Sequence, residues 1–128
     1  MRLLMDTHTL LWFALASSKM SKKARELVSE RANDRFLSIA SPWEVGIKVS
    51  TGKLTLAKPV DVFFSERIRQ NEFMIMPITL AHIALVTTLP FHHRDPFDRM
   101  LIAQSLVEGI PIVSADTAFD QYGVTRFW

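Results

Sequence analysis

Four acidic residues stand at positions from which their side chains can meet at one end of a sheet: Asp6, Glu44, Asp98 and Asp116. Asp6 and Asp116 each follow a short apolar run that is typical of a buried strand, and Glu44 closely follows a third such run. Asp98 begins a helix that leads into the strand before Asp116, and a helix antiparallel to that strand begins at the strand's carboxyl end. We therefore expect the four carboxylates to converge on one cleft.

Each acidic residue also has a local structural explanation. Asp6 and Asp116 could be N-caps of the helices that follow them, and Asp98 lies in a first helical turn with Asp95 as a possible cap. Glu44 completes an S-x-x-E capping box that would open its own helix. Helix dipoles favour such carboxylates by about 0.3 to 1 kcal/mol each. Two carboxylates about 5 Å apart, however, repel by roughly 3 kcal/mol at an effective dielectric constant near 20. Four together therefore require raised pKa values or a divalent cation.

The donor set indicates which cation this would be. The chain has no cysteine, and a site of carboxylate oxygens suits Mg²⁺ or Mn²⁺. Such an ion activates water and stabilises the charge that grows on a phosphoryl oxygen. The residues alone thus predict metal-dependent hydrolysis of a phosphodiester or phosphoester. A zinc site is the alternative, although its spacing matches no known zinc motif; its members would be His82, His92, His93 and Asp95.

The elements that must position these side chains alternate between strands and helices. The 128 residues predict one domain, residues 1–128, of the α/β class with a central, mainly parallel sheet of about five strands flanked by helices. The expected strands are 2–5, 36–40, 73–76, 110–115 and 124–127. The expected helices are 9–16, 21–32, 41–52, 60–71, one capped by Thr79, one ending at Gly109, and a helical turn at 117–122.

Composition limits the partners and the compartment. The formal net charge is +2 and the isoelectric point about 9.2, which permits a phosphate-bearing partner without requiring one. The absence of cysteine allows a reducing compartment. The longest apolar run, residues 10–16, is too short to cross a bilayer, so we expect a cytoplasmic protein without membrane association.

Several segments resemble the PIN domain, specifically the VapC-type toxins of toxin–antitoxin pairs. They are LLMDTHTLLW at 3–12, SPWEVGIKVSTGKL at 41–54, LPFHHRDPFDRMLIAQSLVEGIPIVSAD at 89–116 and FDQYGVTRFW at 119–128. The resemblance implies a three-layer PIN-like fold and a Mg²⁺- or Mn²⁺-dependent endoribonuclease that cleaves RNA with a metal-activated water. It also implies a homodimer and a cognate antitoxin that neutralises the enzyme.

The resemblance carries roles for individual residues. It implies that the catalytic acidic positions are Asp6, Glu44, Asp98 and Asp116. Of these, Asp6, Asp98 and Asp116 would hold the metal, while Glu44 would orient water or complete the site. Ser114 matches a position that supports the site, and Asp95 is a candidate outer ligand. His8 stands where many relatives carry asparagine, which leaves its role open.

Basic and aromatic residues supply weaker candidates for contact with RNA. Arg99 could meet a phosphate or form an ion pair with nearby Asp95. Lys48 could also contact RNA, but it lies four residues after Glu44, and a helical i,i+4 pair with Glu44 explains it equally well. Three tryptophans could stack on bases or pack in the core or an interface: Trp12, Trp43 and Trp128.

Three other functions compete with the nuclease. A haloacid-dehalogenase-like phosphatase would use Asp6, but it needs a second aspartate where His8 stands. A response-regulator receiver needs paired acids after the first strand and a lysine after the last, but here the first strand ends in a single aspartate and Arg126 lies within the last strand. A non-catalytic partner-binding module of similar fold remains the third alternative.

Overall fold

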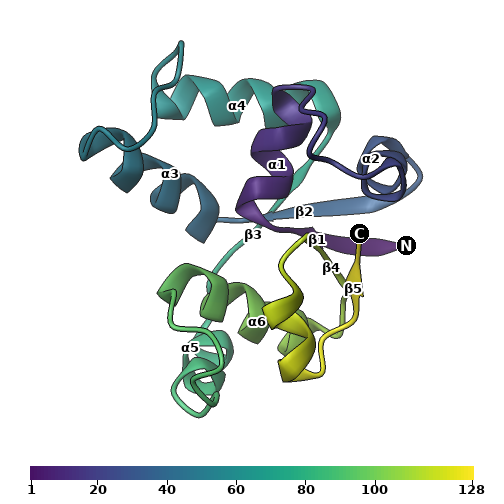
Figure 1. Ribbon diagram of the computed structural model, residues 1–128, viewed down its shortest axis with the longest axis vertical. Helices are drawn as coiled ribbons and strands as arrows, with labels where there is room; N and C mark the ends of the chain where they lie inside the picture. Colours follow the sequence, from purple (N-terminus) through teal and green to yellow (C-terminus); the bar gives the residue numbers. More distant parts are fainter.

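The computed structural model describes residues 1–128 as a five-stranded parallel sheet between two layers of helices (Figure 1). The strands are β1 Arg2–Met5, β2 Asp34–Ser38, β3 Met74–Met76, β4 Ile112–Val113 and β5 Arg126–Phe127. Their order in the sheet is β3-β2-β1-β4-β5, so the first strand of the chain lies in the centre. The α/β class and the parallel sheet predicted from the sequence are confirmed.

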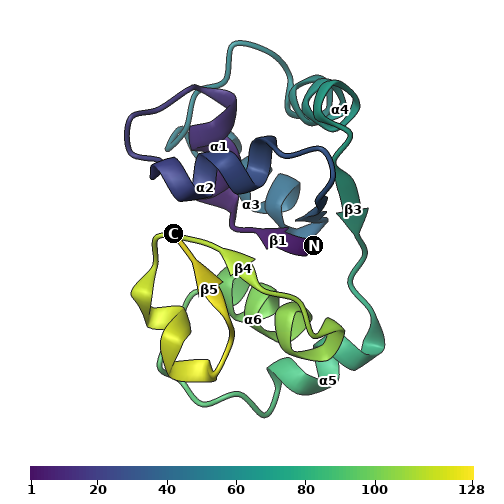
Figure 2. The same cartoon turned by 90° about the vertical axis from the view of Figure 1, so that its right-hand side faces the viewer.

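Helices cover both faces of the sheet (Figure 2). One layer holds α1 Thr7–Ala14, α2 Lys22–Ser29, α3 Ala40–Ser50 and α4 Val60–Asn71. The other holds α5 Leu80–Val86, α6 Pro96–Glu108 and the 3₁₀ helix η1 Thr117–Tyr122. Alternate side chains of β1 serve the two layers, since Leu3 and Met5 pack in the first core cluster and Leu4 in the second. None of these helices is both long enough and apolar enough to cross a membrane.

The chain changes direction across the sheet at β1. From β1 it proceeds outward to β2 and β3, then returns through α5 and α6 to β4 on the other side of β1. Leu4 pairs with Phe36 of β2 on one side and with Ile112 of β4 on the other. The gap between the carboxyl ends of β1 and β4 is thus a topological switch point, where parallel sheets commonly place ligands.

Most of the predicted helix caps are confirmed, although α1 and α2 end earlier than predicted, at Ala14 and Ser29. The side chains of Asp6, Ser21, Thr79, Asp95 and Asp116 each accept a hydrogen bond from a backbone N–H in the first turn that follows. Helix α6 ends where predicted, at Gly109, which has a φ of 66°. Three of these caps are aspartates, Asp6, Asp95 and Asp116, and each fixes the start of a helix at the carboxyl end of the sheet. The same hydrogen bonds fix the positions of their carboxylates.

The predicted capping box at the start of α3 is wrong. The helix begins at Ala40, one residue before Ser41, and has no side-chain cap. Instead, the hydroxyl of Ser41 is 2.8 Å from the hydroxyl of Thr7, which in turn donates to Glu44. A contact with the segment after β1 therefore replaces the local pairing that the S-x-x-E pattern favours.

The last two strands are shorter than predicted, because only two residues of each pair with neighbours. Past Val113, the backbone N–H of Ser114 still donates to the carbonyl of Phe127. The chain then turns, and the hydroxyl of Ser114 accepts from the N–H of Asp116. The turn brings Asp116 back over the end of β4.

Gly109 and Gly46 provide a matched pair for testing the backbone at the end of α6. No neighbouring atom lies within 4 Å of a Cβ placed at either position, but only Gly109 has a positive φ. We expect Gly109→Ala to destabilise the domain by about 1 to 2 kcal/mol. Gly46→Ala, in the interior of α3, should stabilise it by roughly 0.5 to 1 kcal/mol. Urea denaturation measures both, and equal effects of the two substitutions would contradict this assignment.

Candidate active site

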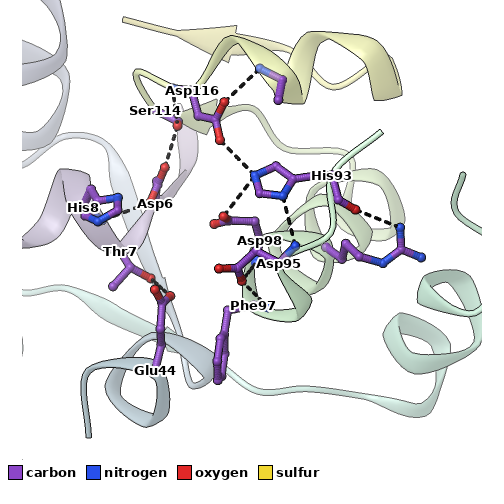
Figure 3. Close-up of polar contacts among 12 residues, drawn as sticks. Asp6, Thr7, His8, Glu44, His93, Asp95, Phe97, Asp98, Ser114 and Asp116 are labelled. Carbon is purple, nitrogen blue, oxygen red and sulfur yellow. Dashed lines mark hydrogen bonds and ion pairs between the residues drawn. The ribbon is translucent and has the colours of Figure 1, made fainter. Parts of the chain in front are cut away.

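Carboxylates from four elements surround one space at the carboxyl end of the sheet (Figure 3). Asp6 directly follows β1, Glu44 lies on α3, Asp98 lies in the first turn of α6, and Asp116 follows β4. The structure therefore brings together the four acidic residues that the sequence selects. Asp95, the N-cap of α6, lies beside them.

Asp6 is held by hydrogen bonds to both of its carboxylate oxygens. It is 5% exposed, and one of its oxygens accepts from the backbone N–H of His8 at 3.0 Å. The other accepts from the hydroxyl of Ser114 at 2.6 Å, across the switch point between β1 and β4. Burial raises the pKa of Asp6 above its ordinary value, while these two hydrogen bonds oppose the rise. Ser114 thus holds Asp6 in place from the end of the neighbouring strand.

Glu44 is fixed by one neutral donor and one cation. Its Oε1 accepts from the hydroxyl of Thr7 at 3.0 Å, and its Oε2 accepts from Nζ of Lys48 at 2.9 Å. The helical i,i+4 pair considered for Lys48 is therefore present. Glu44 itself is buried, so its carboxylate has a defined direction within the site.

Asp98 shows how much negative charge this space contains. Burial, together with the charges of four neighbouring carboxylates, raises the pKa of the Asp98 carboxyl to about 8; these neighbours are Asp6, Asp95, Glu44 and Asp116. A cation that binds beside a carboxyl group with such a raised pKa stabilises its ionised form. The site thus meets the physical condition for a divalent cation that the sequence indicated.

His93, which the sequence suggested only as part of a zinc site, lies within this acidic site. Its Nε2 lies 3.0 Å from Oδ2 of Asp116 and 3.1 Å from Oδ2 of Asp98 (Figure 3). The other histidines of the zinc alternative lie elsewhere, with buried His82 on Glu108 and His92 against the ring of Tyr122. That zinc grouping is therefore wrong.

The ligand atoms of His93, Asp98 and Asp116 all lie within 4.8 Å of one another, close enough to share one metal ion. No other three acidic or histidine residues meet this condition. Asp6 faces the same space but is not part of this group (Figure 3). The carboxylate donors suit a hard divalent cation such as Mg²⁺ or Mn²⁺.

The sequence matches the family model of the PIN domain over residues 3–124. The chain belongs to the PIN domain family. This membership replaces the phosphatase and receiver alternatives, which are different families. A search of curated proteins finds no match to the sequence.

Solved structures share this PIN domain's fold at low sequence identity. A chain of VapBC2 from Rickettsia felis, bound to a DNA fragment from their promoter, superposes with a TM-score of 0.71 at 13% identity and covers 99% of this chain and 98% of its own. A chain of FitAcB from Neisseria gonorrhoeae gives 0.67 at 17% identity, with 98% and 96% covered. A chain of VapBC-1 from nontypeable Haemophilus influenzae gives 0.63 at 13% identity, with 99% and 97% covered.

Arg99 neither faces the acidic space, where it could meet a phosphate, nor pairs with Asp95. The residue is 5% exposed, and its guanidinium donates to the backbone carbonyls of Val86, Leu89, Pro90 and His93 rather than to Asp95. The same group lies 4.0 Å from the centre of the Phe91 ring. Because its donors are used inside the fold, Arg99 shapes the loop before α6 and is not free to meet a phosphate.

The tryptophans differ in their exposure. Trp43 is 65% exposed on α3, where its ring meets that of Phe97 edge-on at 5.3 Å beside the PIN domain's acidic space. Trp12 and Trp128 pack edge-on against each other at 5.7 Å on the first core cluster. A hollow of about 200 Å³ next to Phe97 is lined by Glu44, Asp95 and two lysines, Lys48 and Lys53.

The raised pKa of Asp98 predicts how the stability of the metal-free PIN domain depends on pH. An unfolded aspartate has a pKa near 3.8, so ionising Asp98 in the folded state costs stability as pH rises from about 4 to about 8. Asp98→Asn removes this cost. We expect thermal unfolding in EDTA to show a variant that matches the wild type near pH 4 and exceeds it above pH 8, by about 3 to 5 °C for each kcal/mol regained. A difference that is constant with pH would contradict the assignment.

Proposed function

We propose that this PIN domain, residues 1–128, is a Mg²⁺- or Mn²⁺-dependent endoribonuclease toxin that a cognate antitoxin neutralises. The observation that carries the proposal is the convergence of Asp6, Glu44, Asp98 and Asp116 at the switch point of a PIN fold. The raised pKa of Asp98 supports a cation at this place, because the carboxylates exceed the positive charge beside them.

Asp98 and Asp116, together with Asp6, are the residues that would hold the cation. Bound there, it would supply an activated water and neutralise the charge that develops on a phosphoryl oxygen. The chain's own donors keep these carboxylates in place. Ser114 and the backbone of His8 orient Asp6, while the N–H of Ala118 donates to Oδ1 of Asp116 at 2.9 Å.

Glu44 and the nearby lysines would act on water and on the substrate. Because Thr7 and Lys48 already orient both oxygens of Glu44, its remaining lone pairs would accept hydrogen bonds from water at a fixed position. Lys48 and Lys53 line the adjoining hollow, where their charge would reduce the repulsion between an RNA backbone and the acidic residues. Trp43, exposed beside Phe97, offers a flat aromatic face to an unstacked base.

The proposed protein partners rest on the resemblance to VapC-type toxins and on the shared fold with chains of VapBC2, FitAcB and VapBC-1. We propose an antitoxin encoded beside this gene and a homodimer of the PIN domain, both within the cytoplasm. Light scattering of the purified chain at micromolar concentration tests the dimer, and a homogeneous monomer would exclude it.

Replacing an acidic residue of the site should abolish RNA cleavage. We expect Asp98→Asn and Asp6→Asn to lower the rate on a short RNA by on the order of 100-fold or more, since losing even a supporting partner of a metal site costs 10- to 100-fold. EDTA should stop the wild-type reaction, and added Mg²⁺ or Mn²⁺ should restore it. Labelled RNA resolved on a gel measures each rate.

Asp61→Asn is the control for these substitutions, because Asp61 is an exposed acidic residue on α4, away from the site. It should cleave at the wild-type rate. Cleavage that survives EDTA would exclude the metal, and normal cleavage by Asp98→Asn would exclude the site. A chain that binds RNA without cleaving it under any of these conditions would favour the non-catalytic alternative.

Lys53 tests whether the hollow beside Glu44 receives the RNA backbone. We expect Lys53→Gln to weaken RNA binding a few-fold and to reduce the slope of log K against log salt concentration by about 1. Lys22→Gln serves as the control, since Lys22 is exposed on α2, far from α3 (Figure 1). Fluorescence anisotropy across a salt series measures both slopes, and equal slopes for the two variants would place the RNA elsewhere.

A further inference from the structure

We propose that His93 is a positioning residue that holds Asp98 and Asp116 at the separation needed for one divalent cation, and that it does so as a hydrogen-bond donor and not as a metal ligand. The proposal rests on the metal site proposed above and adds to it a residue outside the acidic set. It is carried by three independent features: the contacts of Nε2, the contact of Nδ1 and the construction of the loop.

The first feature is that one ring nitrogen touches two carboxylates. Nε2 of His93 lies 3.0 Å from Asp116 and 3.1 Å from Asp98, and both contacts are to Oδ2 atoms. These two aspartates come from different elements, α6 and the segment after β4. When both aspartates are ionised, as cation binding requires, their like charges repel unless a donor lies between them. The Nε2–H group of His93, which donates to Asp116 and lies at ion-pair distance from Asp98, keeps them together.

The second feature fixes which nitrogen carries the hydrogen. Nδ1 of His93 accepts a hydrogen bond from the backbone N–H of Asp95 at 3.2 Å. A backbone N–H can only donate, so Nδ1 presents its lone pair and the ring hydrogen is on Nε2. A nitrogen that bears hydrogen has no lone pair to give a metal. Although His93 is close enough to be a ligand, its hydrogen-bonding pattern makes it a donor to the ligands.

The third feature is a loop built to keep this ring still. The backbone N–H of His93 donates to the hydroxyl of Tyr122 at 2.7 Å, and that hydroxyl donates to the carbonyl of Pro90. Buried Arg99 donates to the carbonyls of Pro90 and His93. The ring itself packs at 5.9 Å from that of Phe119, which is fully buried. The imidazole is thereby fixed by residues that take no part in the acidic cluster.

Two variants separate positioning from coordination. His93→Gln retains an N–H donor at the reach of Nε2 but offers no imidazole nitrogen, whereas His93→Ala retains neither. If His93 positions the carboxylates, His93→Ala should weaken Mn²⁺ binding by about 10- to 100-fold, the usual cost of losing a partner of the ligands. His93→Gln should recover most of that loss. Titration of the purified chain with Mn²⁺, followed by electron paramagnetic resonance, measures the affinities without reference to cleavage.

Two spectra on the wild-type chain complete the test. In the metal-free protein, long-range ¹H–¹⁵N correlation should show His93 with the hydrogen on Nε2. In the Mn²⁺-loaded protein, pulsed electron paramagnetic resonance should show no histidine nitrogen bonded directly to manganese. A directly bonded nitrogen would overturn the proposal, as would unchanged Mn²⁺ affinity in His93→Ala or equal losses in both variants. If the wild-type chain binds no Mn²⁺, the proposed metal-dependent function fails as well. If it binds Mn²⁺ but the variants behave otherwise than expected, only the role of His93 fails.

Discussion

Repulsion between like charges is the constraint that shapes the carboxyl end of this sheet. Asp6, Asp95 and Asp116 each stand at the start of a helix, where backbone N–H groups point at their oxygens. Asp98 has no such donor from its own turn, and burial together with the neighbouring carboxylates raises its pKa to about 8. The domain thus retains an arrangement that costs folding stability, which is the usual mark of a site selected for chemistry.

The basic side chains nearest to the acidic cluster do not neutralise its negative charge. Arg99 lies one residue after Asp98 in the sequence, yet its guanidinium turns into the fold and is satisfied by four backbone carbonyls. Lys48 reaches only Glu44, at the edge of the space. Had Arg99 paired with Asp95 or Asp98, it would have neutralised the cluster from within. Its burial instead makes rigid the loop that carries His93.

Much of this arrangement could be predicted from local sequence, because local rules govern helix starts and buried strands. The caps at Asp6, Asp95 and Asp116 follow from their positions before apolar helices, and the end of α6 follows from Gly109. The capping rule failed at Ser41, because the hydroxyl of Ser41 pairs with the hydroxyl of Thr7, which comes from another part of the chain. His93 could not be distinguished from His92, since Tyr122 and Arg99 decide which ring turns inward.

The strand order has a consequence for how the chain is made. β1 is synthesised long before its partner β4, which begins at Ile112, and the hydrogen bond between Asp6 and Ser114 joins residues 108 positions apart. A nascent chain that has folded β1 to β3 around α1 to α4 still lacks Asp98, Asp116 and the loop that presents His93. Such long-range pairing closes late in folding. The acidic cluster is therefore completed only after Asp116 has been synthesised, so a chain that stops before β4 has a partial core but no complete acidic site.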